Sequence, residues 1–464
     1  MGKLAFPVRL HRPPKVFYGW WIVAIALLDD ALKHGSFNRG FTLYVPPIRQ
    51  ELGIGVAVIS LADMLGRLEG GILGPVAGYL TDRLGPRTML AMGGLLSGLG
   101  FILLSLTHSY LYFMLIFIGF LSLGFRSGYN NASIAALNNW FRRKRSLAMS
   151  IASIGNGLGG ALAPLVGLLV FTLGWRTAAL ISGIGILAVV VPLSLLVRRS
   201  PEDMGLLPDG DRLESPQRQP RESFGAAVAG NPGHGHPAVA RPRANPSAAD
   251  PDFTAKEAMR TPSYWLLVLA VGFRNTVHSG MSFLLAPVMV WFLVSGGRGE
   301  KESLPIAALF VGLLSFSTLF FNPCVGWLGD TWSKQRLSAV TMVAGSLALL
   351  VLLLGHNSGH LWMLAIFAIL LAFSESANPL AWAIMGDFFG RRSFATIRGW
   401  QHLPDQLMSM STPVWMGWIF DRTGSYFWAL IPLVALYGIS AFFYWILPKP
   451  NIPSRLLRTE ASVR

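Results

Sequence analysis

The chain has 464 residues, of which 52% are hydrophobic and 13% charged, with a formal net charge of +15 and a mean hydropathy of +0.49. A soluble fold of this length would leave much of its apolar surface in water, so the composition excludes a soluble globular protein and indicates a membrane protein. The single Cys324 excludes a disulfide framework within the chain and a cysteine metal site.

Twelve apolar stretches follow one another along the sequence, in two sets of six. A helix needs roughly 20 residues to cross the hydrocarbon core, and each stretch is close to or above that length. The sequence therefore predicts an all-α membrane protein with twelve transmembrane helices in two pseudo-symmetric six-helix bundles. The stretches are 17–45, 56–80, 88–107, 110–137, 146–172, 175–197, 263–295, 303–329, 337–355, 361–386, 395–420 and 425–447.

The basic residues divide unevenly between the predicted loops. If the N-terminus is cytoplasmic, 28 of the 38 Lys and Arg residues fall in cytoplasmic segments, five in external loops and five within spans. Cytoplasmic loops of membrane proteins carry this excess, so both termini are predicted to be cytoplasmic. The positive charge then reflects topology, and we expect no nucleic-acid partner.

The segment between the two sets is rich in Pro, Gly and Arg, which predicts a flexible cytoplasmic linker over 198–260. The linker separates an N-terminal bundle (1–197) from a C-terminal bundle (261–450), which a cytoplasmic tail (451–464) follows. Thr254 and Glu257 have capping-box spacing and predict a short helix before the seventh span. His234 and His236 lack a surrounding ligand set, so we expect no metal and no cofactor. No cleavable signal peptide is apparent.

A charged loop occurs once in each set of spans. The first copy reads Gly78-Tyr-Leu-Thr-Asp82-Arg83-Leu-Gly85, with Pro86 and Arg87 after it. A fainter copy, 248 residues later, reads Gly326-Trp-Leu-Gly-Asp330, before Arg336. At the same offset Pro75 matches Pro323, Phe125 matches Phe373, Asn130 matches Asn378, Phe141 matches Phe389 and Arg143 matches Arg391. Parallel repeats of this kind predict two halves with a binding site between them near the midplane of the membrane.

The loop at 78–87 resembles the signature of the major facilitator superfamily. Further segments resemble a bacterial branch related to monocarboxylate and oxalate/formate carriers: Tyr18-Gly-Trp-Trp21, Asn139-Trp-Phe141, Gly174-Trp-Arg176 and the run from Ser200 to Gly210. The resemblance implies the major facilitator fold and transport by alternating access. The chain is neutral around Thr318 and Asn322, where animal monocarboxylate carriers have an acidic and a basic residue, and it has Asn38 or Arg39 near their first-span lysine.

The charges of the loop copies suggest a cytoplasmic gate. The Asp82 carboxylate is placed to meet the positive end of a neighbouring helix, and Arg83 and Arg87 to bind carbonyls or acids of other spans. Alternatively, these residues only anchor a tight turn. Thr331 stands at the position equivalent to Arg83, so the two gates are expected to differ in strength. The predicted gating residues are Gly78, Asp82, Arg83, Gly85, Arg87, Asp330 and Arg336.

Charges inside spans are costly and therefore mark candidate sites. In the first span, Asp29 is followed by Asp30, Lys33 and His34, of which the last three share one helix face. The repeat aligns Asp30 with His278 of the seventh span. Asp30, helped by His278 or Lys33, is the leading predicted proton site; the alternative is a charge network that only holds the halves together.

Arg126 in the fourth span is the leading candidate for an anion contact, because guanidinium binds carboxylate through two parallel hydrogen bonds. Glu375 lies one position away in the repeat, so the two residues either bridge the cavity or are each paired within their own half. Arg274 is a second anion contact. Asp63 and Arg67 are interpreted as a structural pair, and His402 and Asp405 as further polar lining. The predicted substrate-binding residues are Arg126, Arg274, Tyr129, Asn130, Phe37 and Tyr44, and the predicted proton-coupling residues are Asp30, Glu375, His278 and Lys33.

Together these features predict a carrier and no enzyme, because the glycine-rich segments lack a phosphate-binding loop. The expected partners are a small organic anion such as a carboxylate, a proton or other coupling ion, and the lipid bilayer. The chain is expected to act as a monomer in a bacterial inner membrane. Two alternatives remain: proton-driven efflux of amphipathic or cationic compounds, and a membrane sensor that transports nothing.

Overall fold

The computed structural model describes residues 16–53, 56–211 and 252–451. The histidine pair of the linker, His234 and His236, and the tail 452–464 lie outside these residues. Every regular element in the described residues is helical, which confirms the all-α fold. The helices group into twelve rods, where a rod is one continuous helix or a succession of short helices that corresponds to one apolar stretch. Each half of the chain contains six rods, as the apolar stretches predict.

The N-terminal half contains the first six rods. Two of them are broken where π-helical segments join α-helices, and the others are continuous. In chain order the rods are α1 (Gly19–Lys33) with η1 (His34–Asn38) and α2 (Phe41–Leu52); α3 (Val56–Leu84); α4 (Pro86–Ser105); α5 (Tyr110–Ile116) with η2 (Phe117–Tyr129) and α6 (Asn130–Trp140); α7 (Arg145–Leu173); and α8 (Trp175–Leu196).

The C-terminal half repeats this order. Its fourth and fifth rods are each broken by a short irregular turn. The rods are α10 (Pro262–Ser295); α11 (Glu300–Thr331); α12 (Lys334–Leu354); α13 (Leu361–Glu375) with α14 (Asn378–Phe389); α15 (Phe394–Ser409) with α16 (Thr412–Thr423); and α17 (Phe427–Ile446).

Nine of the rods in the described chain are long and apolar enough to cross a membrane by length and composition alone. The other three are α1 with α2, α3, and α15 with α16. These three rods carry a dense set of charged or titratable side chains: Asp29, Asp30, Lys33, Asp63, Arg67, Glu69, Arg398, His402 and Asp405. Ionisable residues in membrane helices face the interior of the bundle, so these rods are expected to line it.

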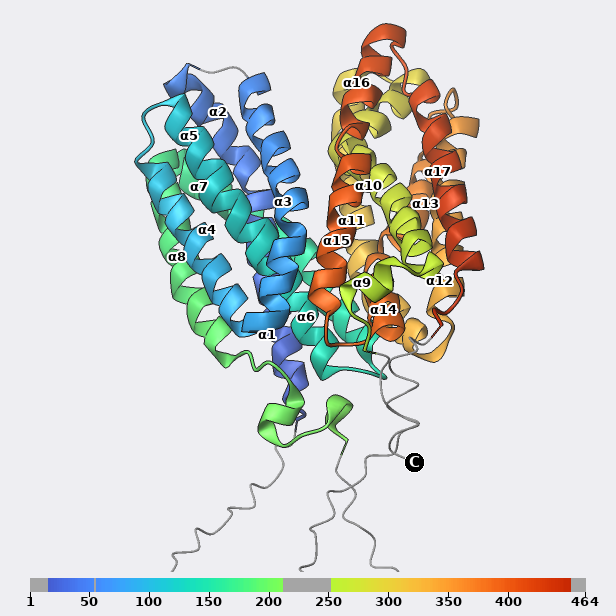
Figure 1. Ribbon diagram of the computed structural model, residues 1–464. Coiled ribbons are helices and arrows are strands. Elements are labelled where there is room, and N and C mark those ends of the chain that lie inside the picture. The colour runs from blue at the N-terminus through green and yellow to red at the C-terminus, as the bar shows by residue number, and fades with distance from the viewer. Residues whose placement is uncertain (1–15, 54–55, 212–251, 452–464) are drawn as a thin grey trace, which may run out of the picture.

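The two halves meet mainly through α3 against α15 and through α7 against α11. We call the end where α9 and the turn Pro201–Met204 lie the linker end; it is the lower end of Figure 1. The halves lie side by side there and diverge toward the upper end, between α3 and α16 (Figure 1).

Close backbone approach at the linker end depends on glycine. A Cβ atom added at Gly399 of α15 would clash with the carbonyl oxygen of Gly74 in α3, and one added at Gly78 would clash with the carbonyl of Ala395. On the other side of the interface, a Cβ at Gly326 of α11 would lie 2.5 Å from the Cβ of Ser150 in α7. Small residues allow such contacts between membrane helices.

The described ends of the linker bind one equivalent loop in each half. Asp209, in the turn η4 (Pro208–Gly210), accepts hydrogen bonds from the backbone N–H groups of Arg142, Arg143 and Lys144 at 3.1, 2.8 and 3.2 Å. Asp252 accepts from those of Arg391 and Arg392, both at 3.3 Å.

The short helix predicted before the seventh span is present as α9 (Ala255–Met259), at the end of the linker. Thr254 and Glu257 form a reciprocal capping box at its start, which confirms the spacing argument.

Candidate functional site

At the linker end, the Asp82 carboxylate caps a helix of the opposite half. It accepts hydrogen bonds from the backbone N–H of Ala395 at 3.1 Å, the N–H of Thr396 at 2.8 Å and the Thr396 hydroxyl at 2.6 Å. These residues form the first turn of α15, where N–H groups have no partner within the helix and the helix dipole is positive. The expected meeting of Asp82 with a neighbouring helix end is therefore observed.

The second copy of the loop makes the reciprocal contact. Asp330, at the end of α11, accepts hydrogen bonds from the backbone N–H groups of Ser146 at 2.9 Å and Leu147 at 3.0 Å, in the first turn of α7. Each half thus provides an aspartate that caps a helix of the other half. Asp82 has three donors and Asp330 has two.

The arginines of the loop copies do not make the contacts expected of them. Arg83 donates to the hydroxyl of Tyr79, one turn back in its own helix, at 3.3 Å. Arg87 is exposed beside the end of α8, and the Arg336 guanidinium lies 6.0 Å from the centre of the Trp445 ring. The prediction that Arg83 and Arg87 bind other spans is wrong for this structure, because neither side chain makes a hydrogen bond or ion pair with another span within the described part of the chain. Arg199, which the sequence analysis missed, donates to the carbonyl of Asp82 at 2.7 Å.

A second link between the halves was also missed. Asp387 of α14 accepts from Arg145 at 2.5 Å and from Lys334 at 2.7 Å. Arg145 is fully buried and belongs to the N-terminal half, 242 residues away. Arg145 ends the basic run 142–145, so the sequence counts it among the loop charges that reflect topology and does not reveal this role.

Arg398 is a further buried arginine at the interface. It lies in α15 and donates to Asn131 of α6 at 2.6 Å across the interface. Its guanidinium lies 4.9 Å from the ring centre of Trp382. Because α15 begins at Phe394, Arg398 lies one turn inside the helix.

Arg126 is paired within the N-terminal half. Its guanidinium lies 2.6 Å from Asp63 of α3, whose other oxygen is 2.9 Å from Arg67. Arg126 is 17% exposed, whereas Asp63 and Arg67 are more than 40% exposed. Asp63 and Arg67 do pair as interpreted, but Asp63 also provides the counter-charge for Arg126.

Arg274 is paired within the C-terminal half. It donates to Glu375 of α13 at 2.5 Å, and Nδ1 of His278 lies 2.7 Å from the same carboxylate oxygen. Arg274 also donates to Asn275 at 2.7 Å, and Asn275 donates to Asp405 at 2.8 Å. One carboxylate therefore holds an arginine and an imidazole from successive turns of α10.

These pairs settle the alternative posed for Arg126 and Glu375 in favour of pairing within each half; the bridge between them is not formed. The repeat brings the two positions to equivalent places, but each acid or base finds a nearer partner in its own bundle. Asp30 and His278 are not paired with each other either. Asp30 lies 2.8 Å from Lys33 and 3.5 Å from His34, within its own rod.

Asp29 is the acid of the first rod that stands out in the structure. It is 2% exposed, and neither carboxylate oxygen has a hydrogen-bond partner among the described residues. The adjacent Asp30 hid it at the level of sequence, because Asp30 has the helical spacing to Lys33 and His34.

Arg39, at the junction of η1 and α2, is exposed and reaches Asn156 of α7 at 3.5 Å. Within the described part of the chain it has no carboxylate partner, unlike Lys33, Arg67, Arg126 and Arg274.

The aromatic candidates are mostly core residues. Tyr44 is fully buried with its hydroxyl 3.0 Å from Ser182, and Tyr129 is 2% exposed. Phe37 stacks on Phe125 at 4.7 Å, and its ring centre lies 5.6 Å from the Arg126 guanidinium. In this conformation Phe37 is the aromatic candidate that touches a site charge. The side chain of Asn130 lies outside the described residues.

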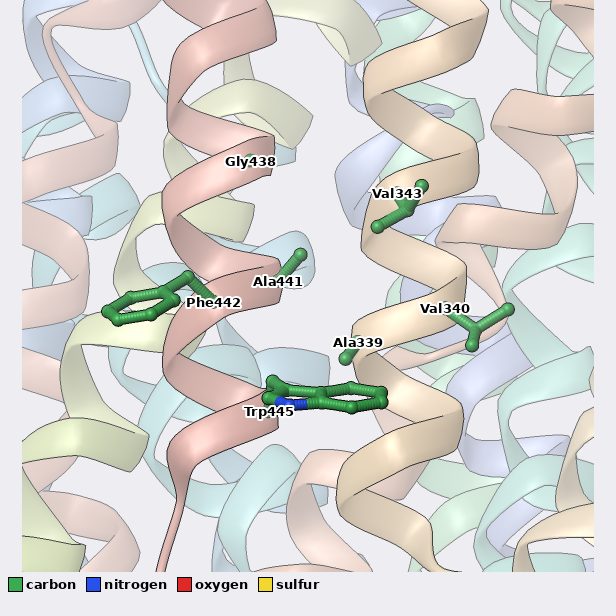
Figure 2. Close-up of a pocket in the computed structure, with 7 residues that line it drawn as sticks. All are labelled: Ala339, Val340, Val343, Gly438, Ala441, Phe442 and Trp445. Atoms are coloured by element: carbon green, nitrogen blue, oxygen red, sulfur yellow. The ribbon is translucent and has the colours of Figure 1, made fainter.

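A hollow in the surface of the C-terminal half lies apart from these charges. Figure 2 shows its lining between α12 and α17, which is apolar throughout and ends at Trp445. None of the predicted substrate or proton residues contributes to it.

The family model of the Major Facilitator Superfamily matches residues 20–397. Among curated proteins, the chain is 33% identical to "Monocarboxylate transporter 13" of Rattus norvegicus, over 37% of this chain and 40% of that protein. It is 24% identical to "Monocarboxylate transporter 1" of Bos taurus, over 93% of this chain and 85% of that protein. The chain thus spans about 40% of the length of the first relatives it matches, and most of the length of others.

Among solved structures, the chain is similar to a Major Facilitator Superfamily transporter, FucP, in the outward conformation. The TM-score is 0.64 at 14% identity, with 93% of this chain and 99% of that chain covered. A variant of the E. coli Fucose:proton symporter FucP matches with a TM-score of 0.62 at 14% identity, over 93% of this chain and 98% of that one. At this identity the likeness shows the fold alone.

Proposed function

The chain belongs to the Major Facilitator Superfamily, and from that premise we propose that this multi-pass membrane transporter carries a small carboxylate together with a proton by alternating access. The names of its monocarboxylate-transporter relatives support a carboxylate as substrate. The pairing of buried arginines with carboxylates supports a proton as the coupling ion.

The proposal rests on the ion pair between Arg274 and Glu375. Arg274 is 5% exposed and Glu375 is 15% exposed, so their charges compensate each other in a poorly hydrated place. A substrate carboxylate can take the place of Glu375 at the guanidinium only if the charge of Glu375 is removed. A proton on Glu375 does this, and His278, 2.7 Å away, is placed to exchange that proton. One proton and one carboxylate then enter as a neutral pair.

Arg126 and Asp63 form the equivalent pair in the N-terminal half. We propose that Arg126 provides a second contact for the substrate and that Phe37, against its guanidinium, forms an apolar wall. Arg39 adds a positive charge free of ion pairs in the described part of the chain, which favours anions over cations. Asp30 and Lys33 neutralise each other and have a supporting role in this scheme.

Alternating access requires a contact that can open. We propose that the caps made by Asp82 and Asp330 hold the halves together at the linker end, which is the cytoplasmic end by the distribution of basic residues. In this scheme the bundles 1–197 and 261–450 rock about the site as a monomer, with both termini cytoplasmic and the linker 198–260 joining them.

The test is uptake of radiolabelled monocarboxylates into proteoliposomes with an imposed pH gradient, after a thermal-shift screen has identified a ligand. Wild-type protein should accumulate the substrate when the outside is acidic. Glu375→Gln should retain exchange of substrate across the membrane but lose accumulation driven by the gradient. Arg274→Gln should lose both.

Arg298→Gln, a partly exposed arginine beyond the end of α10, serves as the matched control and should behave as wild type. Proton-driven accumulation by Glu375→Gln at the wild-type level would rule out Glu375 as the coupling acid. Uptake unchanged in both Arg274→Gln and Arg126→Gln would rule out the arginines as substrate contacts.

The buried Asp29 favours a second candidate, proton-driven efflux of cationic compounds. A buried acid without a donor among the described residues can be neutralised by a proton or by a cationic ligand. If the protein is such an antiporter, the thermal-shift screen selects cationic drugs, adding them to protein in detergent releases protons, and Asp29→Asn abolishes that release. This candidate would be excluded if the thermal-shift screen selected carboxylates as ligands and if Asp29→Asn released protons as the wild-type protein does.

A further inference from the structure

Besides the hollow between α12 and α17, a second hollow lies in the N-terminal half, at the linker end of α4 and α8. Its volume is about 450 Å³, and part of its lining comes from the turn Pro201–Met204 that follows α8. The hollow lies away from Arg126 and Arg274, on the rod pair that forms the outer side of this half in Figure 1. Its lining residues are Leu84, Gly85, Arg87, Thr88, Val197, Arg198, Arg199, Asp203 and Met204.

The lining is strongly basic. Three arginines face one acid, Asp203, whose carboxylate already accepts the N–H of Ser200 at 3.2 Å. Arg199 is engaged with the carbonyl of Asp82 at 2.7 Å. Arg87 and Arg198 are exposed and make no side-chain hydrogen bond or ion pair within the described part of the chain. Two guanidinium groups are therefore available to a ligand.

The surroundings of the hollow are apolar. Leu84 at the end of α3 is 47% exposed, and Leu195 and Leu196 at the end of α8 are 49% and 53% exposed. A chain that spans a bilayer places such leucines against acyl chains, with the arginines just beyond them at the level of the headgroups. Planar guanidinium groups bind phosphate oxygens through paired hydrogen bonds, and basic pockets between membrane helices bind anionic headgroups.

We propose that this hollow binds the phosphate of an anionic phospholipid through Arg87 and Arg198, with the acyl chains against the exposed leucines of α3 and α8. The ligand chemistry is a phosphate ester, and the apolar rim favours a lipid over a soluble phosphate as its source. The proposal concerns a site apart from the transport pathway and does not depend on the substrate.

The other half of the repeat provides an internal comparison. The equivalent rods are α12 and α17, because α12 begins 248 residues after α4. The hollow between them, shown in Figure 2, has no charged residue in its lining. Arg336, the nearby arginine, lies over Trp445. At the 248-residue offset only Trp445 corresponds to a lining residue of the N-terminal hollow, Val197, so the two hollows lie at different places along equivalent rods, and the arginine cluster lines only the N-terminal one.

The test measures lipid retained by the purified full-length protein in a neutral detergent, by native mass spectrometry. Phosphatidylglycerol is compared with phosphatidylcholine of the same acyl chains. Each arginine near an anionic surface contributes about 1 kcal/mol, so Arg87→Gln and Arg198→Gln should each weaken phosphatidylglycerol binding about five-fold and the double variant about 25-fold. Arg336→Gln, at the equivalent place in the other half, should bind as wild type.

Two results would overturn the proposal: wild-type retention of phosphatidylglycerol by the double variant, or equal loss in Arg336→Gln. Inorganic phosphate and glycerol phosphate form a further arm. If they raise the unfolding temperature as much as phosphatidylglycerol does at equal concentration, the ligand is a soluble phosphate and the lipid assignment is wrong. Arg87→Lys/Arg198→Lys keeps both charges and should restore most of the binding, which separates a lost ligand from a damaged fold.

Discussion

At the scale of single residues, the buried arginines show how a membrane bundle accommodates charge. Arg126 and Arg274 occupy different halves, and each is compensated by an acid on a neighbouring rod. The sequence identifies them as costly charges inside spans. It cannot identify their partners, because Asp63 and Glu375 are distant along the chain and the choice depends on how the rods are rotated.

Removing one member of such a pair should lower the free energy of unfolding more than removing both members. Glu375→Gln or Arg274→Gln alone leaves a buried charge without its main partner, which costs about 3–5 kcal/mol of unfolding free energy. The double variant Arg274→Gln/Glu375→Gln removes both charges and should recover most of that loss. Thermal unfolding of the four proteins in one detergent measures the coupling between the pair. Additive losses would show that the two residues act independently.

At the scale of helices, the aspartate caps join the N-terminus of a helix in one half to the end of a helix in the other. Asp82 accepts hydrogen bonds from backbone N–H groups at the start of α15, and Asp330 accepts them from those at the start of α7. The loop copies predicted the aspartates, and helix dipoles predicted their role. The same reasoning was wrong for Arg83 and Arg87, since a charged loop motif does not reveal which side chains turn toward the interface.

Removing a cap should weaken the linker-end contact. A lost cap costs about 1 kcal/mol, which corresponds to roughly five-fold in the population of the opened state. With Cys324 changed to Ser, a cysteine at the buried position Ser150 reports opening through its rate of maleimide labelling. Asp82→Ala should raise the rate more than Asp330→Ala, because it removes the acceptor for three donors and not two.

Asp421→Ala, an exposed acid at the opposite end, is the control for this measurement and should leave the labelling rate unchanged. Equal rates in Asp82→Ala and in the parent protein would show that the cap does not hold the halves together.

At the scale of the whole molecule, the twelve rods and their two-fold organisation follow from the apolar stretches and the 248-residue repeat. The end at which the halves lie side by side does not follow from them, because neither pattern indicates which helix ends pack against each other. The closure seen here depends on local fits such as Gly74 against Gly399, which no periodicity in the sequence indicates.

A side chain added where Gly74 packs against Gly399 should favour separation of the two halves at the linker end. Gly399→Ala places a methyl group where the backbone of Gly74 lies, so α3 and α15 must separate at the linker end. The expected result is faster labelling of the cysteine at position 150, together with slower net transport. Gly417→Ala in α16 has open space around its Cβ and should change neither the labelling rate nor net transport. Unchanged labelling in Gly399→Ala would mean that the interface absorbs the methyl group without opening.

The reciprocal caps of Asp82 and Asp330 have the form of an interface between two identical subunits, in which one residue contacts a second and the second contacts the first. In a dimer of six-helix chains, one aspartate codon would specify both caps at once, and every change there would act twice. Joining the two copies in one chain allows each cap to be altered alone. The extra hydroxyl donor of Thr396 on one side is an asymmetry that such a dimer cannot have.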